Sequence, residues 1–255
     1  MSNTEPGSIA WLARPGLPRL AYRATPGKSP GIVFLGGFAS DMTGTKATAL
    51  EMAARARGQA FLRFDYRGHG ESGGRFVDST VGDWLEDALA LFDHATMGPQ
   101  ILVGSSMGGW IALLVAINRP ERVRALVGIA AAPDFTQRLM WDGMSEQDRE
   151  ALLRVGILLP PSHYGEPIPI TRALIEDGRQ HLLLDRPIPF AGPVRLLHGQ
   201  CDPDVPWRHS LLTAECLTSE DVRITLIKDG DHRLSRPQDL ALLIDTVEEL
   251  TRSEL

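Results

Sequence analysis

The chain has little of what disulfide frameworks, metal clusters or membrane spans are built from. It contains 2 cysteines among 255 residues, Cys201 and Cys216, too few for a disulfide framework or a cysteine metal cluster. No apolar run is long enough to cross a bilayer, and the N-terminal stretch resembles neither a secretory signal nor an arginine-rich leader. We therefore expect no membrane span, no metal and a cytoplasmic location.

Positive charge is also scarce. The 26 lysines and arginines are outnumbered by 32 aspartates and glutamates, which gives a net charge of −6, and there is no basic run. This balance argues against nucleic acid or an anionic membrane as a partner. With 43% hydrophobic residues, the chain can bury the core of one large α/β domain.

Short apolar runs alternate with amphipathic stretches along most of the chain. After a predicted hairpin (8–14 and 19–24), the expected strands are 32–35, 60–66, 101–103, 125–132, 194–199 and 222–227. The expected helices are 43–57, 81–97, a helix that ends at residue 118, 208–217 and 237–250. Such alternation is typical of a mostly parallel sheet flanked by helices, with ligands at the carboxyl edge of the strands.

The run from Gly104 to Gly108 has the form Gly-x-Ser-x-Gly and joins an apolar strand to a helix. In this context the pattern predicts a nucleophile elbow, in which Ser106 sits on a strained turn and the glycines allow the backbones to cross closely. The alternative is an ordinary glycine-rich turn. We favour a nucleophilic Ser106.

Two more residues follow in the order that a serine hydrolase needs. Asp202 lies on the loop after a predicted strand, and His232 lies on the loop after the last one. A histidine can take the serine proton, and a buried carboxylate can orient that histidine. Asp204 and, at lower rank, Asp134 are the alternative acids.

Backbone N–H groups should stabilise the oxyanion. The glycine-rich loop after the strand 32–35 points to Phe38 as one donor, and the residue after the nucleophile, Met107, is the other. His69 lies in a second glycine-rich loop and is interpreted as structural or solvent-facing rather than as a base.

Residues 133–190 interrupt the alternation with proline clusters and two helical patches, 146–155 and 171–181. We interpret this segment as a cap inserted into one domain, 1–255, whose core comprises about 1–132 and 191–255. Met140 and Trp141 are candidates for substrate binding in an apolar pocket. Alternatively, the apolar cap residues only pack the insertion onto the sheet.

The chain resembles the α/β-hydrolase superfamily from about Gly31 to Thr251. Four runs carry a closer similarity to the mitochondrial palmitoyl-protein thioesterases that are also described as acyl-glucuronide esterases: 61–66, 98–110, 194–199 with 205–207, and 231–233. The resemblance implies the same three residues, Ser106, Asp202 and His232, and acyl thioesters or activated esters as substrates.

The resulting hypothesis is a cofactor-free serine hydrolase that cleaves carboxylic esters or thioesters through an acyl-enzyme. Its substrate would be a small molecule or an acylated protein. The alternatives are a small-molecule carboxylesterase, a carbon–carbon bond hydrolase of the same fold, and a ligand-binding module without turnover. A dehalogenase is disfavoured because such enzymes carry an aspartate where this chain has Ser106. The sequence gives no indication of the oligomeric state.

Overall fold

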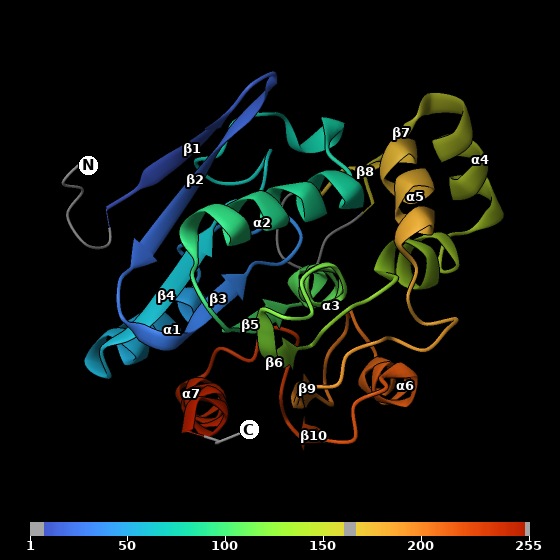
Figure 1. Cartoon of the computed structure of the whole chain (residues 1–255). Coiled ribbons are helices and arrows are strands. Elements are labelled where there is room, and N and C mark those ends of the chain that lie inside the picture. The colour runs from blue at the N-terminus through green and yellow to red at the C-terminus, as the bar shows by residue number, and fades with distance from the viewer. Residues whose placement is uncertain (1–7, 161–166, 253–255) are drawn as a thin grey trace.

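Eight strands form one sheet in the order β1-β2-β4-β3-β5-β6-β9-β10 (Figure 1). The computed structural model describes residues 8–160 and 167–252. The strands are β1 (Ala10–Arg14), β2 (Leu17–Thr25), β3 (Lys28–Leu35), β4 (Gln59–Phe64), β5 (Gln100–Ser105), β6 (Val123–Ile129), β9 (Val194–Gly199) and β10 (Val222–Ile227). From β4 to β10 all neighbours pair in parallel, whereas β1 and β2 add an antiparallel edge. The predicted mostly parallel sheet with an antiparallel hairpin is confirmed.

Helices cover both faces of the sheet, because strands buried on both sides need an apolar partner on each. Helices α1 (Thr45–Ala56) and α7 (Pro237–Arg252) pack on one face (Figure 1). Helices α2 (Val81–Ala95), α3 (Met107–Asn118) and α6 (Arg208–Cys216) lie on the other. A short 3₁₀ turn, Phe76–Asp78, precedes α2.

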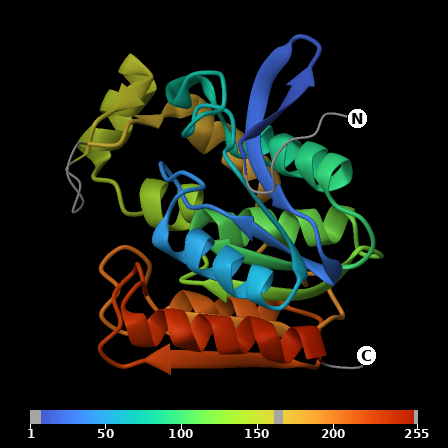
Figure 2. The same cartoon turned by 90° about the vertical axis from the view of Figure 1, so that its left-hand side faces the viewer.

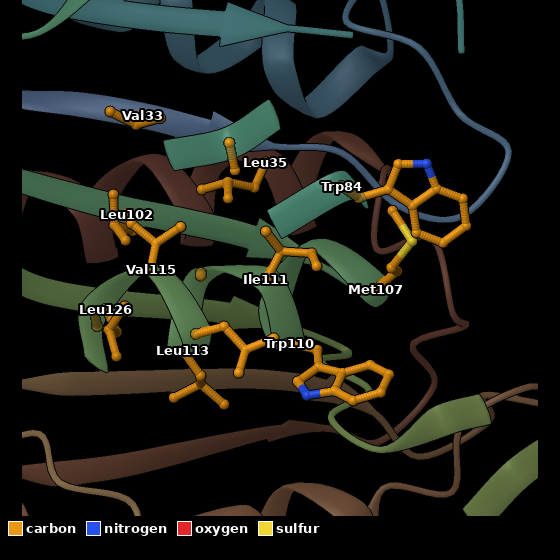
Figure 3. Packing of buried hydrophobic residues seen from close by; sticks show 14 of the residues in the cluster. Val33, Leu35, Trp84, Leu102, Met107, Trp110, Ile111, Leu113, Val115 and Leu126 are labelled. Carbon is orange, nitrogen blue, oxygen red and sulfur yellow. The ribbon is translucent and has the colours of Figure 1, made fainter. Parts of the chain in front are cut away.

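Helix α3 is the most buried helix of the fold. Ten consecutive residues, Met107 to Ala116, are buried, so the sequence is apolar all round rather than on one stripe. Figure 3 shows Ile111 and Val115 of α3 directed at Leu35 and Leu102 of the sheet. This packing fixes the N-terminus of α3 against the tip of β5.

Two predicted strands end earlier than expected, each for a local reason. Strand β4 stops before Asp65, whose carboxylate accepts hydrogen bonds from the N–H groups of Met42 (2.6 Å) and Glu71 (2.9 Å). Strand β6 stops at Ile129 because Ala130 has a left-handed backbone, φ 44°. Side-chain hydrogen bonds and a left-handed residue therefore end these two strands at the edge of the sheet where the loops gather.

The segment between β6 and β9 carries its own short elements. They are a π-helical turn η2 (Thr136–Trp141), α4 (Glu146–Val155), the strand pair β7 (Ile157–Leu158) and β8 (Ile170–Thr171), α5 (Arg172–Gly178) and a 3₁₀ turn η3 (Arg179–His181). The helix expected over 171–181 is thus divided in two. Figure 2 shows this segment on the same side of the molecule as the loops that follow β9 and β10. Residues 161–166 of the predicted cap lie outside the described residues.

None of the helices in the described parts of the chain is long and apolar enough to span a membrane.

Candidate active site

Ser106 occupies the sharp turn between β5 and α3. Its backbone angles are φ 53° and ψ −119°, a strained conformation for a residue with a side chain. A Cβ added to Gly108 would lie 2.1 Å from the carbonyl oxygen of Leu35, and one added to Gly104 would lie 2.3 Å from that of Gly108. The two glycines therefore allow the backbone crossing that holds the serine at the tip of the sheet, as a nucleophile elbow requires.

Asp202 and His232 are in direct contact. Nδ1 of His232 lies 2.7 Å from Oδ2 of Asp202, whose side chain is fully buried. A carboxylate only accepts, so Nδ1–H donates and Nε2 of the neutral ring is left to take a proton. Ser106 and His232 line the same cavity, so this ring borders the space that the serine faces.

The carboxylate of Asp202 is held in its ionised form. Burial by itself would raise its pKa, but hydrogen bonds from His198 and His232 and the N–H of Val205 outweigh burial and hold the pKa well below its usual range. Oδ1 accepts the N–H groups of Asp204 (2.8 Å) and Val205 (2.9 Å). Nε2 of His198 lies 3.3 Å from Oδ2.

The two alternative acids have different surroundings. Asp134 is fully buried, and its two oxygens accept the N–H groups of Leu183 and Leu184, both at 2.8 Å. It therefore ties the segment before β9 to the end of β6 and does not contact His232. Asp204 lines the cavity, and its Oδ2 is buried without a hydrogen-bond partner.

The loop after β3 lies against the elbow. A Cβ on Gly37 would be 3.5 Å from Cβ of Ser106, which brings Phe38 next to the serine. The Phe38 ring packs edge-on against Phe76, Trp84 and Phe135. Met107 is the first residue of α3, so its N–H has no acceptor within the helix. Both predicted oxyanion donors thus border Ser106.

His69 anchors this loop from behind. It is buried (4% exposed), accepts the N–H of Ala39 at Nε2 (3.2 Å), and donates from Nδ1 to the carbonyl of Arg67 (3.2 Å). Burial lowers its pKa, against the opposing effect of that carbonyl. Of the two interpretations offered by the sequence, structural or solvent-facing, the structural one holds.

A cavity of about 540 Å³ opens at Ser106. Most of its wall is apolar, and the segment between β6 and β9 supplies much of it: Leu139, Met140, Met144, Leu158, Ile168 and Ile170. Of the two substrate-binding candidates, Met140 lines this cavity and Trp141 does not. The guanidinium groups of Arg149 and Arg179 instead lie 5.5 Å and 4.7 Å from the Trp141 ring centre.

Among the described residues, one group has donor atoms close enough for a metal ion. Carboxylate and imidazole atoms of Asp202, Asp204 and His232 lie within 4.8 Å of one another. The Asp202 oxygens are already occupied by two N–H groups and by His232. The donor set therefore fits a histidine–carboxylate hydrogen bond better than a cation site.

The sequence does not predict the contacts that two supporting residues, His69 and His198, make. The structural interpretation of His69 holds, but its bond to the N–H of Ala39 in the loop after β3 is visible only in the structure. His198, at the end of β9, reaches the carboxylate of Asp202 with its Nε2. The contact of His69 joins two loops 30 residues apart, so no local pattern could have revealed it. The contact of His198 is local, and its spacing of four residues before Asp202 was the available signal.

Comparison with known proteins agrees with this geometry. A family model described as "Serine aminopeptidase, S33" matches residues 29–164. The bovine mitochondrial palmitoyl-protein thioesterase ABHD10 is 44% identical over 247 residues, which cover 95% of this chain and 80% of the relative. The structure of mouse alpha/beta hydrolase domain-containing protein 10 has a TM-score of 0.89 at 43% identity and covers 95% of this chain and 98% of its own.

A second solved structure, a hydrolase from Agrobacterium vitis described as putative, has a TM-score of 0.91 at 41% identity and covers 96% of this chain and 98% of its own. The predicted cytoplasmic location is wrong by these comparisons, because the ABHD10 relatives are named mitochondrial proteins. The residue pattern at the start of the given sequence was too weak a signal to decide the compartment.

The fold, the strained serine turn, the family model and relatives above 40% identity over nearly the whole chain agree. The chain therefore belongs to the α/β-hydrolase family of serine hydrolases and is a hydrolase of ester or thioester bonds.

Proposed function

We propose that the protein is an acyl-thioesterase that removes long acyl chains from thiols, with Ser106, His232 and Asp202 as its catalytic triad. The observation that carries this proposal is the apolar cavity of about 540 Å³ that opens directly at Ser106. A cavity of this size and character can bury most of an acyl chain. The names of the relatives, palmitoyl-protein thioesterases, give it further support.

The first half of the reaction forms an acyl-enzyme. Nε2 of His232 takes the proton of the Ser106 hydroxyl, and Oγ attacks the acyl carbon. Asp202, bonded to Nδ1 at 2.7 Å, keeps the ring in the required tautomer and stabilises its positive charge. The proton then passes to the sulfur as the carbon–sulfur bond breaks. In the second half, His232 takes a proton from a water molecule, which attacks the acyl carbon. The bond from that carbon to Oγ of Ser106 then breaks, Oγ regains the proton from His232, and the free carboxylic acid leaves.

The oxyanion of each tetrahedral intermediate is met by the N–H groups of Phe38 and Met107. Both groups border Ser106, and Met107 adds the positive end of the α3 dipole. Each such donor contributes about a hundred- to a thousandfold to the rate in related chemistry. Backbone donors suit this task because folding fixes them before the substrate arrives.

The segment 133–190 acts in this proposal as a cap that shapes the acyl cavity within a single domain. Its side chains Met140 and Met144 line the cavity, and methionine adapts to apolar chains because it is flexible and polarisable. In a small packed cluster of the cap, Leu152 and Ile175 accompany Ile170 of the cavity wall.

The decisive experiment measures initial rates on acyl thioesters of N-acetylcysteamine from acetyl to palmitoyl, beside p-nitrophenyl esters of the same acids. The wild type is compared with Ser106→Ala. We expect serine-dependent turnover that rises with chain length on thioesters. Full activity of Ser106→Ala would refute the assigned nucleophile.

Two other outcomes would change the substrate class. Turnover confined to short activated esters would indicate a small-molecule carboxylesterase. Labelling of Ser106 by a fluorophosphonate without turnover of any ester would indicate a ligand-binding module.

A further inference from the structure

A second cavity, of about 260 Å³, meets the acyl cavity at the proposed nucleophile. Phe38, Ser106, Ile168 and His232 line both cavities. A carbonyl carbon bonded to Oγ of Ser106 therefore has one space available for the acyl chain and another for the leaving group. The two spaces differ in their walls, and this difference bears on which leaving groups fit.

The wall of the second cavity carries hydroxyl and cationic side chains among its apolar residues. It is formed by the loop after β3, the first turn of α1 and the loop that carries His232, and it includes Ser40, Thr45, Lys46 and Arg233. An apolar chain would leave these groups without water, which is unfavourable. The acyl chain therefore belongs in the first cavity and the leaving group in the second.

Charge of opposite sign lines the two cavities. Asp148 and Asp204 line the acyl cavity. Lys46 and Arg233 line the second, together with Asp41. The Asp41 carboxylate already accepts a hydrogen bond from the N–H of Thr43 (2.7 Å) and another from its hydroxyl. Both cationic side chains therefore lie in the wall of the second cavity, where they favour negative charge on a substrate over positive charge.

Lys46 is fixed in this wall. Its Nζ donates a hydrogen bond of 2.5 Å to the carbonyl oxygen of Arg233, which links α1 to the loop of His232. Burial lowers the pKa of Lys46 to about 8, while nearby Asp231 opposes that shift. The ammonium group therefore remains mostly charged at neutral pH, at a position set by the fold.

We propose that the second cavity is the leaving-group subsite, and that Lys46 and Arg233 make it select thiols that carry carboxylates close to the sulfur. The substrate class is an acylated cysteine with acidic neighbours in the peptide. Basic neighbours are disfavoured. This inference rests on the thioesterase function proposed above, because it names the leaving group of that reaction.

The reaction step is the same acyl transfer. The bond between the acyl carbon and the cysteine sulfur breaks, the new bond is to Oγ of Ser106, and the sulfur leaves with the proton that His232 took from the serine. No oxidant or cofactor is needed. The freed peptide departs through the second cavity, while the acyl chain stays in the first.

The test uses three S-octanoyl pentapeptides that differ only in the residues beside the cysteine: glutamate, glutamine or lysine on both sides. The full-length wild type is compared with Lys46→Met, Arg233→Gln and the charge-keeping Arg233→Lys. Arg252→Gln, which removes an exposed arginine at the end of α7 (77% exposed side chain), controls for overall charge.

For the wild type we expect kcat/KM for the glutamate peptide to exceed that for the lysine peptide by about 3- to 10-fold. The preference should appear mainly in KM and should shrink when salt screens the charges. Lys46→Met and Arg233→Gln should each reduce the ratio, whereas Arg233→Lys and Arg252→Gln should keep it.

Equal rates on the three peptides, or a preference that survives both neutral variants, would overturn the inference and leave the thioesterase proposal intact. The absence of turnover of all three peptides, with Ser106 still labelled by a fluorophosphonate, would instead overturn the proposed function and this inference with it.

Discussion

The backbone N–H of Ala39 donates a hydrogen bond to Nε2 of His69, with 3.2 Å between the nitrogens. The other ring nitrogen donates to the carbonyl of Arg67, so the ring must be neutral with its proton on Nδ1. Ala39 has a left-handed backbone, φ 55°, and directly follows Phe38. The histidine therefore sets the direction of the loop whose N–H is proposed to meet the oxyanion.

His69→Phe should lower kcat about 10- to 100-fold with little change in KM, because a misdirected N–H weakens the transition state more than the ground state. His69→Gln can still accept the Ala39 N–H and should retain most of the rate. Steady-state kinetics on one thioester compares the variants. A rise in KM with unchanged kcat, or an equal fall in kcat in both variants, would argue for general loosening of the fold.

Acid should destabilise the protein through its buried histidines. Burial lowers the pKa of His69 and of His209, whose Nε2 contacts the carbonyl of Pro133 at 2.6 Å. The unfolded state takes up protons near the ordinary histidine value of 6.5 while the folded state does not. The free energy of unfolding should therefore fall as the pH drops below that value.

Urea unfolding at neutral and mildly acidic pH measures this dependence. His69→Gln should remove part of the acid-side loss, because the residue no longer titrates. An unchanged pH slope in that variant would exclude His69 as a source of the effect.

Asp202→Asn should lower kcat by about a hundred- to ten-thousandfold, since an amide can hold His232 in the wrong tautomer and carries no charge. Asp134→Asn should act differently. It weakens two buried hydrogen bonds to Leu183 and Leu184, which lowers the free energy of unfolding by about 1–3 kcal/mol and spares kcat. A catalytic defect in Asp134→Asn larger than that in Asp202→Asn would reverse the assignment of the acid.

Gly108→Ala should destabilise the fold by about 3 kcal/mol or more, because its Cβ would lie 2.1 Å from a backbone oxygen of Leu35. Gly44→Ala is the matched control: the nearest atom to its Cβ is 3.6 Å away, and the expected loss is below about 1 kcal/mol. Thermal unfolding compares the two variants. Similar losses would contradict the close crossing at the elbow.

Met140→Trp should shorten the acyl cavity. We expect lower kcat/KM for palmitoyl thioesters and nearly unchanged kcat/KM for acetyl or butanoyl thioesters, since only long chains reach the cap wall. Met52→Trp alters a methionine of α1 that is 72% exposed and should change neither value. A uniform loss across chain lengths in Met140→Trp would place the acyl chain elsewhere.

The fold and the order of the three site residues follow from local patterns along the chain. Apolar runs of strand length, separated by helical periods, specify a parallel sheet, because strands buried on both faces and right-handed crossovers leave few alternatives. The Gly-x-Ser-x-Gly run specifies the elbow because only glycine fits both sides of the crossing at Gly104 and Gly108. These features are local, so local patterns predict them.

Which groups far apart in the chain come into contact depends on the tertiary structure. The fold brings His69 to the N–H of Ala39, 30 residues earlier in the chain. It places Asp134 against the N–H groups of Leu183 and Leu184, and it directs Trp141 away from the cavity that Met140 lines. It also brings Lys46 of α1 to the carbonyl oxygen of Arg233, 187 residues later in the chain. Contacts of this kind depend on how loops from separate strands pack at one edge of the sheet. Hydrophobic periodicity and residue spacing describe single elements, so they do not predict this packing.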